Sequence, residues 1–233
     1  MHGNLQTRTV QFSVEEGGKA LAYEARPGGA GSYPGVIIVH EWWGLNEHIQ
    51  DVARRLAHEG FVALAPDLFG GRVTTDSNLA SSWMASLDRE QTVRILMGAV
   101  RFMQENEPIY TQHIGVMGFC MGGSFALLLP CRTDAIKAAV PFYGDLPDPI
   151  DQVRNIRCPV LFIAGGKDQW INAAKVDKLK AAFREYGVHG EVRVYPDAGH
   201  AFFNDTRPDV YHPAAAQDAW MRAIGHLSRI LKS

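Results

Sequence analysis

Three residue types used in nucleophilic catalysis occur in the chain in the order cysteine, aspartate, histidine. The cysteine, Cys120, lies in the segment Gly118-Phe119-Cys120-Met121-Gly122, which has the form G-x-S-x-G with cysteine in the serine position. A nucleophile on such a tight turn between a strand and a helix has strained backbone angles, and the flanking glycines leave room for neighbouring backbone. The pattern therefore predicts a nucleophile elbow with Cys120 as the attacking thiol.

The segments on either side of Cys120 fit this interpretation. The apolar run 114–117 is typical of a buried strand, and 124–129 is typical of a buried helix. At a helix N-terminus the backbone dipole favours the thiolate of Cys120, and the backbone N–H of Met121 would face a developing oxyanion. The alternative is a buried structural cysteine, because free cysteines are among the most buried residues.

Asp168 and His200 each follow a strand-like run, one ending at Ala164 and the other at Tyr195. In a parallel α/β sheet, functional residues lie just beyond the carboxyl ends of the strands. His200 would exchange protons with the thiol and the leaving group, and Asp168 would orient the imidazole. Asp168 could instead be a turn residue, and His200 one of nine histidines without a special role. The agreement of all three positions in order and context favours a catalytic triad.

These residues need a scaffold in which strands and helices alternate, and the chain has that pattern from Gly35 onward. The predicted strands are 35–40, 61–66, 114–117, 136–143, 160–165 and 191–195, and the predicted helices are 47–58, 88–106, 124–129, 172–186 and 213–231. The alternation predicts an α/β fold with a mostly parallel central sheet and helices on both faces. We expect a single domain over residues 1–233, with an N-terminal edge hairpin at about 8–26. The polar, irregular segment 67–86 could form a mobile cap.

Composition narrows the class of protein. A hydrophobic content of 46% and a charged content of 21% are ordinary for a globular protein. The net charge of −2 gives no electrostatic reason to expect binding to nucleic acid or to an anionic membrane surface. No apolar run reaches the roughly 18 residues of a spanning helix, and the first residues lack the apolar core of a signal peptide. We expect a cytoplasmic protein, either a monomer or a small homo-oligomer.

Metal and disulfide chemistry have little support in the sequence. The three cysteines have spacings that fit neither a disulfide framework nor a zinc site. His40 and Glu41 do not continue as H-E-x-x-H, because Gly44 stands where the motif needs its second histidine. We therefore expect no metal.

The chain resembles the dienelactone hydrolase family of α/β-hydrolases, which has cysteine at the elbow. The resemblance rests on VIIVHEWWGLNEHI, FVALAPDLFG, VMGFCMGGSFA, CPVLFIAGGKD and DAGHAFFNDTRPDVYHPAAAQDAW, which extend from about Gly35 to Trp220. It implies the α/β-hydrolase fold, whose triad has the order nucleophile, acid, histidine. It also implies a cofactor-free enzyme that hydrolyses small-molecule esters or lactones through an acyl-enzyme on a Cys-His-Asp triad.

The resemblance adds two residues that spacing alone does not identify. Glu41 matches the family glutamate that contacts the nucleophilic cysteine and helps to take its proton, and a carboxylate in an apolar pocket is a stronger base. Trp42 would supply the second N–H of the oxyanion hole. Glu41 could instead cap the following turn. We interpret His40 as a packing residue at a strand end.

The substrate-binding region departs from the family pattern. Members that act on dienelactone are expected to bind its carboxylate with two arginines, one of which could match Arg72, whereas Asn204 occupies the position of the other. A neutral amide offers no bidentate ion pair, so dienelactone itself is an open question as the substrate. The candidate substrate contacts, in an aromatic-rich pocket, are Arg72, Trp43, Trp83, Phe119, Phe202 and Asn204.

Three other functions compete with this interpretation. A general short-chain carboxylesterase or thioesterase on the same scaffold would differ only in substrate. A non-catalytic small-molecule binding protein would not need all three triad residues. A thiol redox protein would need a resolving cysteine, and Cys131 is expected at the far end of the elbow helix.

Overall fold

The computed structural model describes residues 4–29, 31–105 and 109–233, with only the backbone described for residues 17 and 109–112. The chain is organised as two compact units, Met1–Gly115 and Val116–Ser233. No helix in the described part of the chain combines the length and hydropathy needed to span a bilayer.

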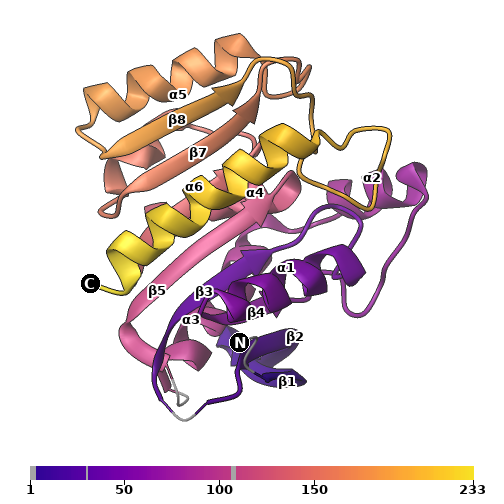
Figure 1. Cartoon of the computed structure of the whole chain (residues 1–233), viewed down its shortest axis with the longest axis vertical. Helices are drawn as coiled ribbons and strands as arrows, with labels where there is room; N and C mark the ends of the chain where they lie inside the picture. Colours follow the sequence, from indigo (N-terminus) through magenta and orange to yellow (C-terminus); the bar gives the residue numbers. More distant parts are fainter. Residues whose placement is uncertain (1–3, 30, 106–108) are drawn as a thin grey trace. The chain divides into compact units, whose positions relative to one another are not determined.

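The first unit is built on strands in the order β1-β2-β4-β3 (Figure 1). The strands are β1 (Leu5–Val14), β2 (Gly18–Pro27), β3 (Tyr33–Val39) and β4 (Val62–Pro66), and the short 3-10 helix η1 (Glu15–Gly17) joins the first two. β1 and β2 pair antiparallel from Leu5–Pro27 to Val14–Gly18, which is the predicted hairpin. β2 and β4 are also antiparallel, whereas β3 and β4 are parallel.

Two long helices pack on these strands. α1 (Glu47–His58) lies against β2 and β4, and α3 (Arg89–Glu105) lies against β1 and β4. α1 begins after Asn46, whose side-chain oxygen accepts a hydrogen bond from the N–H of Ile49 at 3.2 Å. Its apolar residues at helical spacing are buried, and the chain turns at Gly60, which has φ of 82°. The predicted bounds of this helix are confirmed, because the cap and the periodicity were both visible in the sequence.

The prediction of irregular structure throughout 67–86 is wrong, because α2 (Ser77–Ala85) lies within this segment. The helix begins after Asp76, whose Oδ1 accepts hydrogen bonds from the N–H groups of Asn78 at 2.7 Å and Leu79 at 3.2 Å. Ala80 is its only buried residue. A helix that buries so little surface lacks the apolar periodicity on which the prediction depended.

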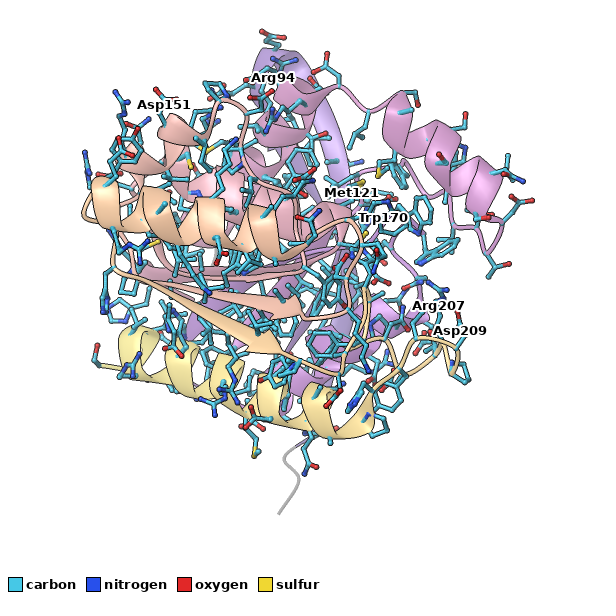
Figure 2. All side chains as sticks on the ribbon, turned by 90° about the horizontal axis from the view of Figure 1, so that it is seen from above. Arg94, Met121, Asp151, Trp170, Arg207 and Asp209 are labelled. Atoms are coloured by element: carbon cyan, nitrogen blue, oxygen red, sulfur yellow. The ribbon has the colours of Figure 1, made fainter. Side chains whose placement is uncertain are left out.

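The second unit begins within β5 (Ile109–Phe119), which ends directly before Cys120. The strand order here is β5-β6-β7-β8, with β6 (Ile136–Phe142), β7 (Val160–Gly165) and β8 (Gly190–Tyr195) parallel to one another. The helices are α4 (Met121–Leu128), α5 (Ala173–Glu185) and α6 (Pro213–Leu231), with the 3-10 helices η2 (Leu129–Cys131) and η3 (Ile150–Asn155). Figure 2 shows α5 and α6 on opposite sides of β7 and β8. The predicted parallel strands with helices on both faces are thus confirmed in this unit.

Candidate active site

The elbow has the backbone strain that the sequence predicted. Cys120 precedes the first residue of α4 with φ of 54° and ψ of −118°, which side-chain-bearing residues rarely adopt. Its N–H donates to the carbonyl oxygen of Phe142, and its own carbonyl oxygen accepts from the N–H of Ser124, both at 3.1 Å. These two bonds attach the turn to the end of β6 and to the first turn of α4. Cys120 is half-buried.

Glycine is required around this turn because backbone segments pass very close to one another. A Cβ atom on Gly118 would collide with the carbonyl oxygen of Gly122. One on Gly123 would collide with the carbonyl oxygen of Phe142 and would lie 2.9 Å from the amide nitrogen of Gly144. Gly123 lies just beyond the G-x-C-x-G segment, and its role is to let α4 approach the end of β6.

Asp168 and His200, which are predicted to act together, are in direct contact. Oδ2 of Asp168 accepts a hydrogen bond from Nδ1 of His200 at 2.7 Å. Oδ1 of the same carboxylate accepts from the N–H groups of Trp170 at 2.8 Å and Ile171 at 2.9 Å. The loop after β7 therefore holds this buried carboxylate by its own backbone.

The environment of Asp168 favours the ionised form. Burial would raise the pKa of this carboxyl group, but the hydrogen bond and charge of His200 outweigh it, helped by the N–H groups of Ile171 and Trp170. The net effect is a pKa below the ordinary value. An ionised carboxylate can only accept, so it fixes the proton of His200 on Nδ1 and leaves the lone pair on Nε2.

His200 is placed to exchange a proton at Nε2. Among the described residues, this buried nitrogen has no hydrogen-bond partner. The imidazole ring packs against Tyr143, with centroids 5.1 Å apart, and perpendicular to Trp170 at 4.9 Å. Only 17% of the side chain is exposed. The ring is held on two sides, and one nitrogen is left available for chemistry.

Backbone strain is concentrated near these residues. The described non-glycine residues with positive φ are Glu16, Cys120, Tyr143 and Ala201. Cys120 and Tyr143 follow the ends of β5 and β6, and Ala201 follows His200 directly. A bulky residue such as Tyr143 rarely adopts a φ of 39°. Such strain persists where the surroundings enforce it, which is typical of functional sites.

A groove of about 510 Å³ opens beside His200. It is lined by residues from three segments of the second unit: Lys167, Gln169, Trp170, Asp197, Gly199, His200, Asp209, Val210, Tyr211 and His212. Figure 2 shows Met121, Trp170 and Asp209 at the same end of this unit. The histidine thus faces a space of the size that small ligands occupy.

Glu41 and Trp42 lie in the first unit, in the loop that follows β3. The Glu41 side chain is buried and that of Trp42 half-buried. Trp42 packs edge-on against Trp43, with ring centroids 5.0 Å apart. The carbonyl oxygen of Trp43 accepts from the N–H of Thr74 at 3.1 Å, which connects this loop to the segment after β4.

His40 does more than pack, and the interpretation from sequence was incomplete. The side chain is fully buried; Nδ1 donates to the carbonyl oxygen of Glu41 at 2.6 Å, and Nε2 accepts from the N–H of Leu68 at 3.1 Å. Burial lowers the pKa of His40, so the imidazole is neutral, as this donor–acceptor pattern requires. His40 therefore joins the Glu41 loop to the loop after β4.

Two of the predicted substrate contacts in the first unit touch each other. The guanidinium of Arg72 lies 4.9 Å from the ring centroid of Trp83, and its Nε donates to the carbonyl oxygen of Phe69 at 2.9 Å. Trp83 also packs edge-on against Phe69, with centroids 5.7 Å apart. Arg72 is thus held over an aromatic ring of α2 in a cation–π contact.

The predicted contacts of the second unit, Phe119, Phe202 and Asn204, are buried and do not line the groove. Phe119 stacks on Phe203 at 5.1 Å between centroids, and Phe202 packs against Tyr143 at 5.6 Å. Asn204 is buried, and its Oδ1 accepts from the N–H of Thr206 at 3.1 Å. A substrate-contacting role for these residues stays a prediction.

Sequence reasoning did not identify Tyr143 or Trp170 as neighbours of His200. The signal for Tyr143 was its place at the carboxyl end of the predicted strand 136–143. The signal for Trp170 was its position two residues after Asp168. Within the described residues there is no group of three or more histidine, cysteine or acidic side chains that could hold a metal ion.

Comparison with known proteins gives consistent results. The model of the dienelactone hydrolase family matches residues 21–231. A Methylorubrum extorquens protein assigned as a carboxymethylenebutenolidase is 38% identical over 86% of this chain and 74% of its own length. A Bradyrhizobium protein assigned as a 2-oxo-3-(5-oxofuran-2-ylidene)propanoate lactonase is 36% identical over 91% of this chain and 90% of its own length. The structure of a Klebsiella pneumoniae protein described as a dienelactone hydrolase is 31% identical, with a TM-score of 0.88 over 96% of this chain and 99% of that one.

Proposed function

The chain belongs to the dienelactone hydrolase family, and we propose that it hydrolyses carboxylic esters or lactones with Cys120 as the nucleophile. The observation that carries the proposal is the 2.7 Å hydrogen bond between Asp168 and His200. It orients the imidazole in the same unit that presents Cys120 on a strained elbow. A protein that only binds small molecules would need neither feature.

Acylation begins with the transfer of the thiol proton of Cys120, by way of a carboxylate base, to Nε2 of His200. The sulfur attacks the carbonyl carbon, and the charge that develops on oxygen is stabilised by the backbone N–H of Met121 at the start of α4. As the tetrahedral intermediate collapses, protonated His200 gives its Nε2 proton to the leaving oxygen. The C–O bond breaks, the alcohol departs, and the acyl group remains on sulfur as a thioester.

Deacylation repeats these steps with water. His200 takes a proton from water at Nε2, and the hydroxide attacks the thioester carbonyl. Asp168 stabilises the resulting imidazolium without taking its proton. The carbon–sulfur bond breaks, Cys120 recovers a proton, and the carboxylic acid leaves. For a lactone, the alcohol and the acid are parts of one ring-opened product.

We assign Glu41 and Trp42 roles in acylation on the strength of the family resemblance. Glu41 would take the thiol proton when substrate is bound, and the backbone N–H of Trp42 would give the oxyanion a second donor. Support comes from the burial of the Glu41 side chain. Burial disfavours the charged form of a carboxylate, which makes it a stronger base. A cytoplasmic location and a monomeric or small homo-oligomeric state stay predictions from the sequence.

The substrate class is carboxylic esters and lactones, and the preferred member is left to experiment. The wild type, Cys120→Ala and Cys131→Ala would be assayed on p-nitrophenyl acetate, simple lactones and cis-dienelactone. Cys131 is the matched control, because it is a buried thiol in the 3-10 helix that follows α4. We expect Cys120→Ala to lose at least about 10⁴-fold in kcat and Cys131→Ala to retain activity.

Two results would contradict the proposal. Undiminished turnover in Cys120→Ala would exclude Cys120 as the nucleophile. Absence of turnover by the wild type on every ester and lactone would favour the binding-protein alternative.

A further inference from the structure

The groove beside His200 has a composition that selects among esters. Its lining comes from the loop after β7, the loop after β8 and the segment that precedes α6. His200 is part of the wall, whereas Cys120 and Met121 are not. A substrate would therefore place in the groove the part that lies next to His200 during the reaction. The carbonyl group, which Cys120 attacks and the N–H of Met121 stabilises, would lie outside the groove.

Trp170 forms an exposed apolar face in this groove. Its side chain is 61% exposed, which is unusual for so large an apolar residue. Its backbone N–H donates to Asp168, and its ring lies perpendicular to that of His200. The indole is thus fixed relative to the catalytic histidine before any ligand arrives. A fixed aromatic face binds another ring at little cost in conformational entropy.

The charged groups of the lining are already engaged. Nζ of Lys167 lies 3.3 Å from Oδ1 of Asp197. Asp209 pairs with Arg207 at 2.6 Å. The lining contributes one lysine and two aspartates, so an anionic ligand would meet more negative than positive charge.

The two histidines of the lining are engaged as well. His200 donates to Asp168, and Nδ1 of His212 accepts from the N–H of Ala215 at 3.3 Å. An uncharged ligand suits this groove better than an anion.

We propose that the groove binds the alcohol part of uncharged aromatic esters, with the aromatic ring packed on Trp170. This inference rests on the proposed hydrolase function, because it states where the leaving group of that reaction binds. His200 at the wall gives its Nε2 proton to the leaving oxygen as the C–O bond breaks, and the resulting phenol remains against Trp170 until it diffuses out. The groove therefore determines which alcohol the enzyme prefers as the leaving group, whereas Cys120 attacks the ester carbonyl.

Kinetics on matched esters test the placement of the ring. Phenyl acetate, ethyl acetate and the anionic 4-acetoxybenzoate share one acyl group and differ only in the alcohol. We expect Trp170→Ala to lower kcat/KM for phenyl acetate about 3- to 10-fold more than for ethyl acetate, because any loss of support for His200 affects both esters equally. Trp170→Phe should retain most of the activity on phenyl acetate. Met221→Ala removes another exposed large apolar side chain, on α6, and should change neither ester.

Binding of the product tests the groove without turnover. In the Cys120→Ala background, calorimetric titration with 2-naphthol should show binding that weakens by a similar factor when Trp170 is also changed to alanine. Wild-type enzyme should also prefer phenyl acetate to 4-acetoxybenzoate. This binding experiment remains informative even if the hydrolase proposal fails, because it needs no reaction.

The inference would be overturned by equal losses on phenyl and ethyl acetate in Trp170→Ala, which would mean that the ring only supports His200. It would also be overturned by unchanged 2-naphthol binding in the double variant, or by a preference for the anionic ester.

Discussion

Two aspartates in the second unit both have a pKa below the ordinary value, but they are held in different ways. Asp168 is buried, and its carboxylate accepts from two backbone N–H groups and from His200. Asp218, on α6, has a side chain that is 34% exposed. Its Oδ2 accepts from Nε of Arg222 at 2.7 Å and from the hydroxyl of Tyr195 at 2.8 Å.

The cause of the shift also differs between the two carboxylates. The hydrogen bond from Arg222 is the main reason that the pKa of Asp218 is lowered, and burial matters less. For Asp168, burial is the largest influence and acts in the opposite direction, so His200 and the loop backbone must outweigh it. A lowered pKa alone therefore does not identify a functional carboxylate. What distinguishes Asp168 is that its partners are a histidine beside a groove and the backbone of its own loop.

The largest effect should separate these two aspartates by activity. Asp168→Asn removes the charge that stabilises the His200 cation and favours the wrong tautomer, so kcat for p-nitrophenyl acetate should fall roughly 10³- to 10⁴-fold. Asp218→Asn should leave kcat within about twofold. If Asp168→Asn and Asp218→Asn lost activity equally, a special catalytic role for Asp168 would be excluded.

His40 and His226 provide a second test of whether a shifted pKa marks a functional residue. Both are buried histidines whose pKa values are lowered, chiefly by burial. His40→Phe leaves the N–H of Leu68 without its acceptor and frees the Glu41 loop. We expect it to cost about 1–3 kcal/mol in stability and roughly 10-fold or more in kcat/KM. His40→Gln can still donate and accept, so it should restore part of both losses.

His226→Phe is the matched control for this pair of experiments. His226 lies on α6, and its Nε2 is 3.3 Å from the carbonyl oxygen of Pro159, which also accepts from the N–H of Ala139. That oxygen keeps a donor in the variant, so the expected cost is below about 1.5 kcal/mol with kcat/KM unchanged. If His226→Phe lost as much activity as His40→Phe, the loss would be a general consequence of replacing a buried histidine.

The pH dependence of stability should also differ between the two carboxylates. Because Asp168 has a lower pKa in the folded state than its unfolded value of about 3.9, its ionised form stabilises the fold above that pH. This contribution is lost as the pH falls through the folded-state pKa. The difference in free energy of unfolding between wild type and Asp168→Asn should therefore narrow from pH 7 to about pH 3, as followed by urea denaturation.

Asp218→Asn should show the same sign with a smaller amplitude, because solvent and salt screen its ion pairs. A pH-independent difference for Asp168→Asn would mean that the carboxylate contributes through shape and not through charge.

The smallest effect is expected at the surface partner of Asp218. Arg222→Gln breaks a partly exposed ion pair between residues four apart on α6 and keeps a good helix former, so about 0.3–0.5 kcal/mol should be lost. The loss should shrink further in high salt. Thermal denaturation at two salt concentrations measures it, and a loss above about 1 kcal/mol would mean that the surface cluster is structurally more important than its exposure indicates.

The sequence predicted best those features that local chemistry encodes. The helices 47–58 and 213–231 were predicted to the residue, because Asn46 and Pro213 mark their starts and their apolar residues recur at helical spacing. The elbow was predicted because only glycine fits at Gly118. α2 was missed because one buried alanine gives no periodicity.

Features that depend on tertiary contacts could not be predicted. The positive φ of Tyr143 has no signal in a tyrosine, and nothing in the sequence indicates that Trp170 is exposed whereas Phe119 is buried. Aromatic residues occur in both cores and binding sites, so their number near a motif does not separate the two. Likewise, one of the two hydrogen bonds of His40 depends on Leu68, which lies on a different loop.

The account depends most directly on the covalent role of Cys120. Wild-type enzyme would be mixed with excess p-nitrophenyl acetate, the reaction quenched with acid during the first turnover, and the digested protein examined by mass spectrometry. We expect a burst of p-nitrophenol stoichiometric with enzyme and an acetyl group on the peptide that contains Cys120. Turnover without a burst, with the acetyl group absent from Cys120 or present on another residue, would contradict the account.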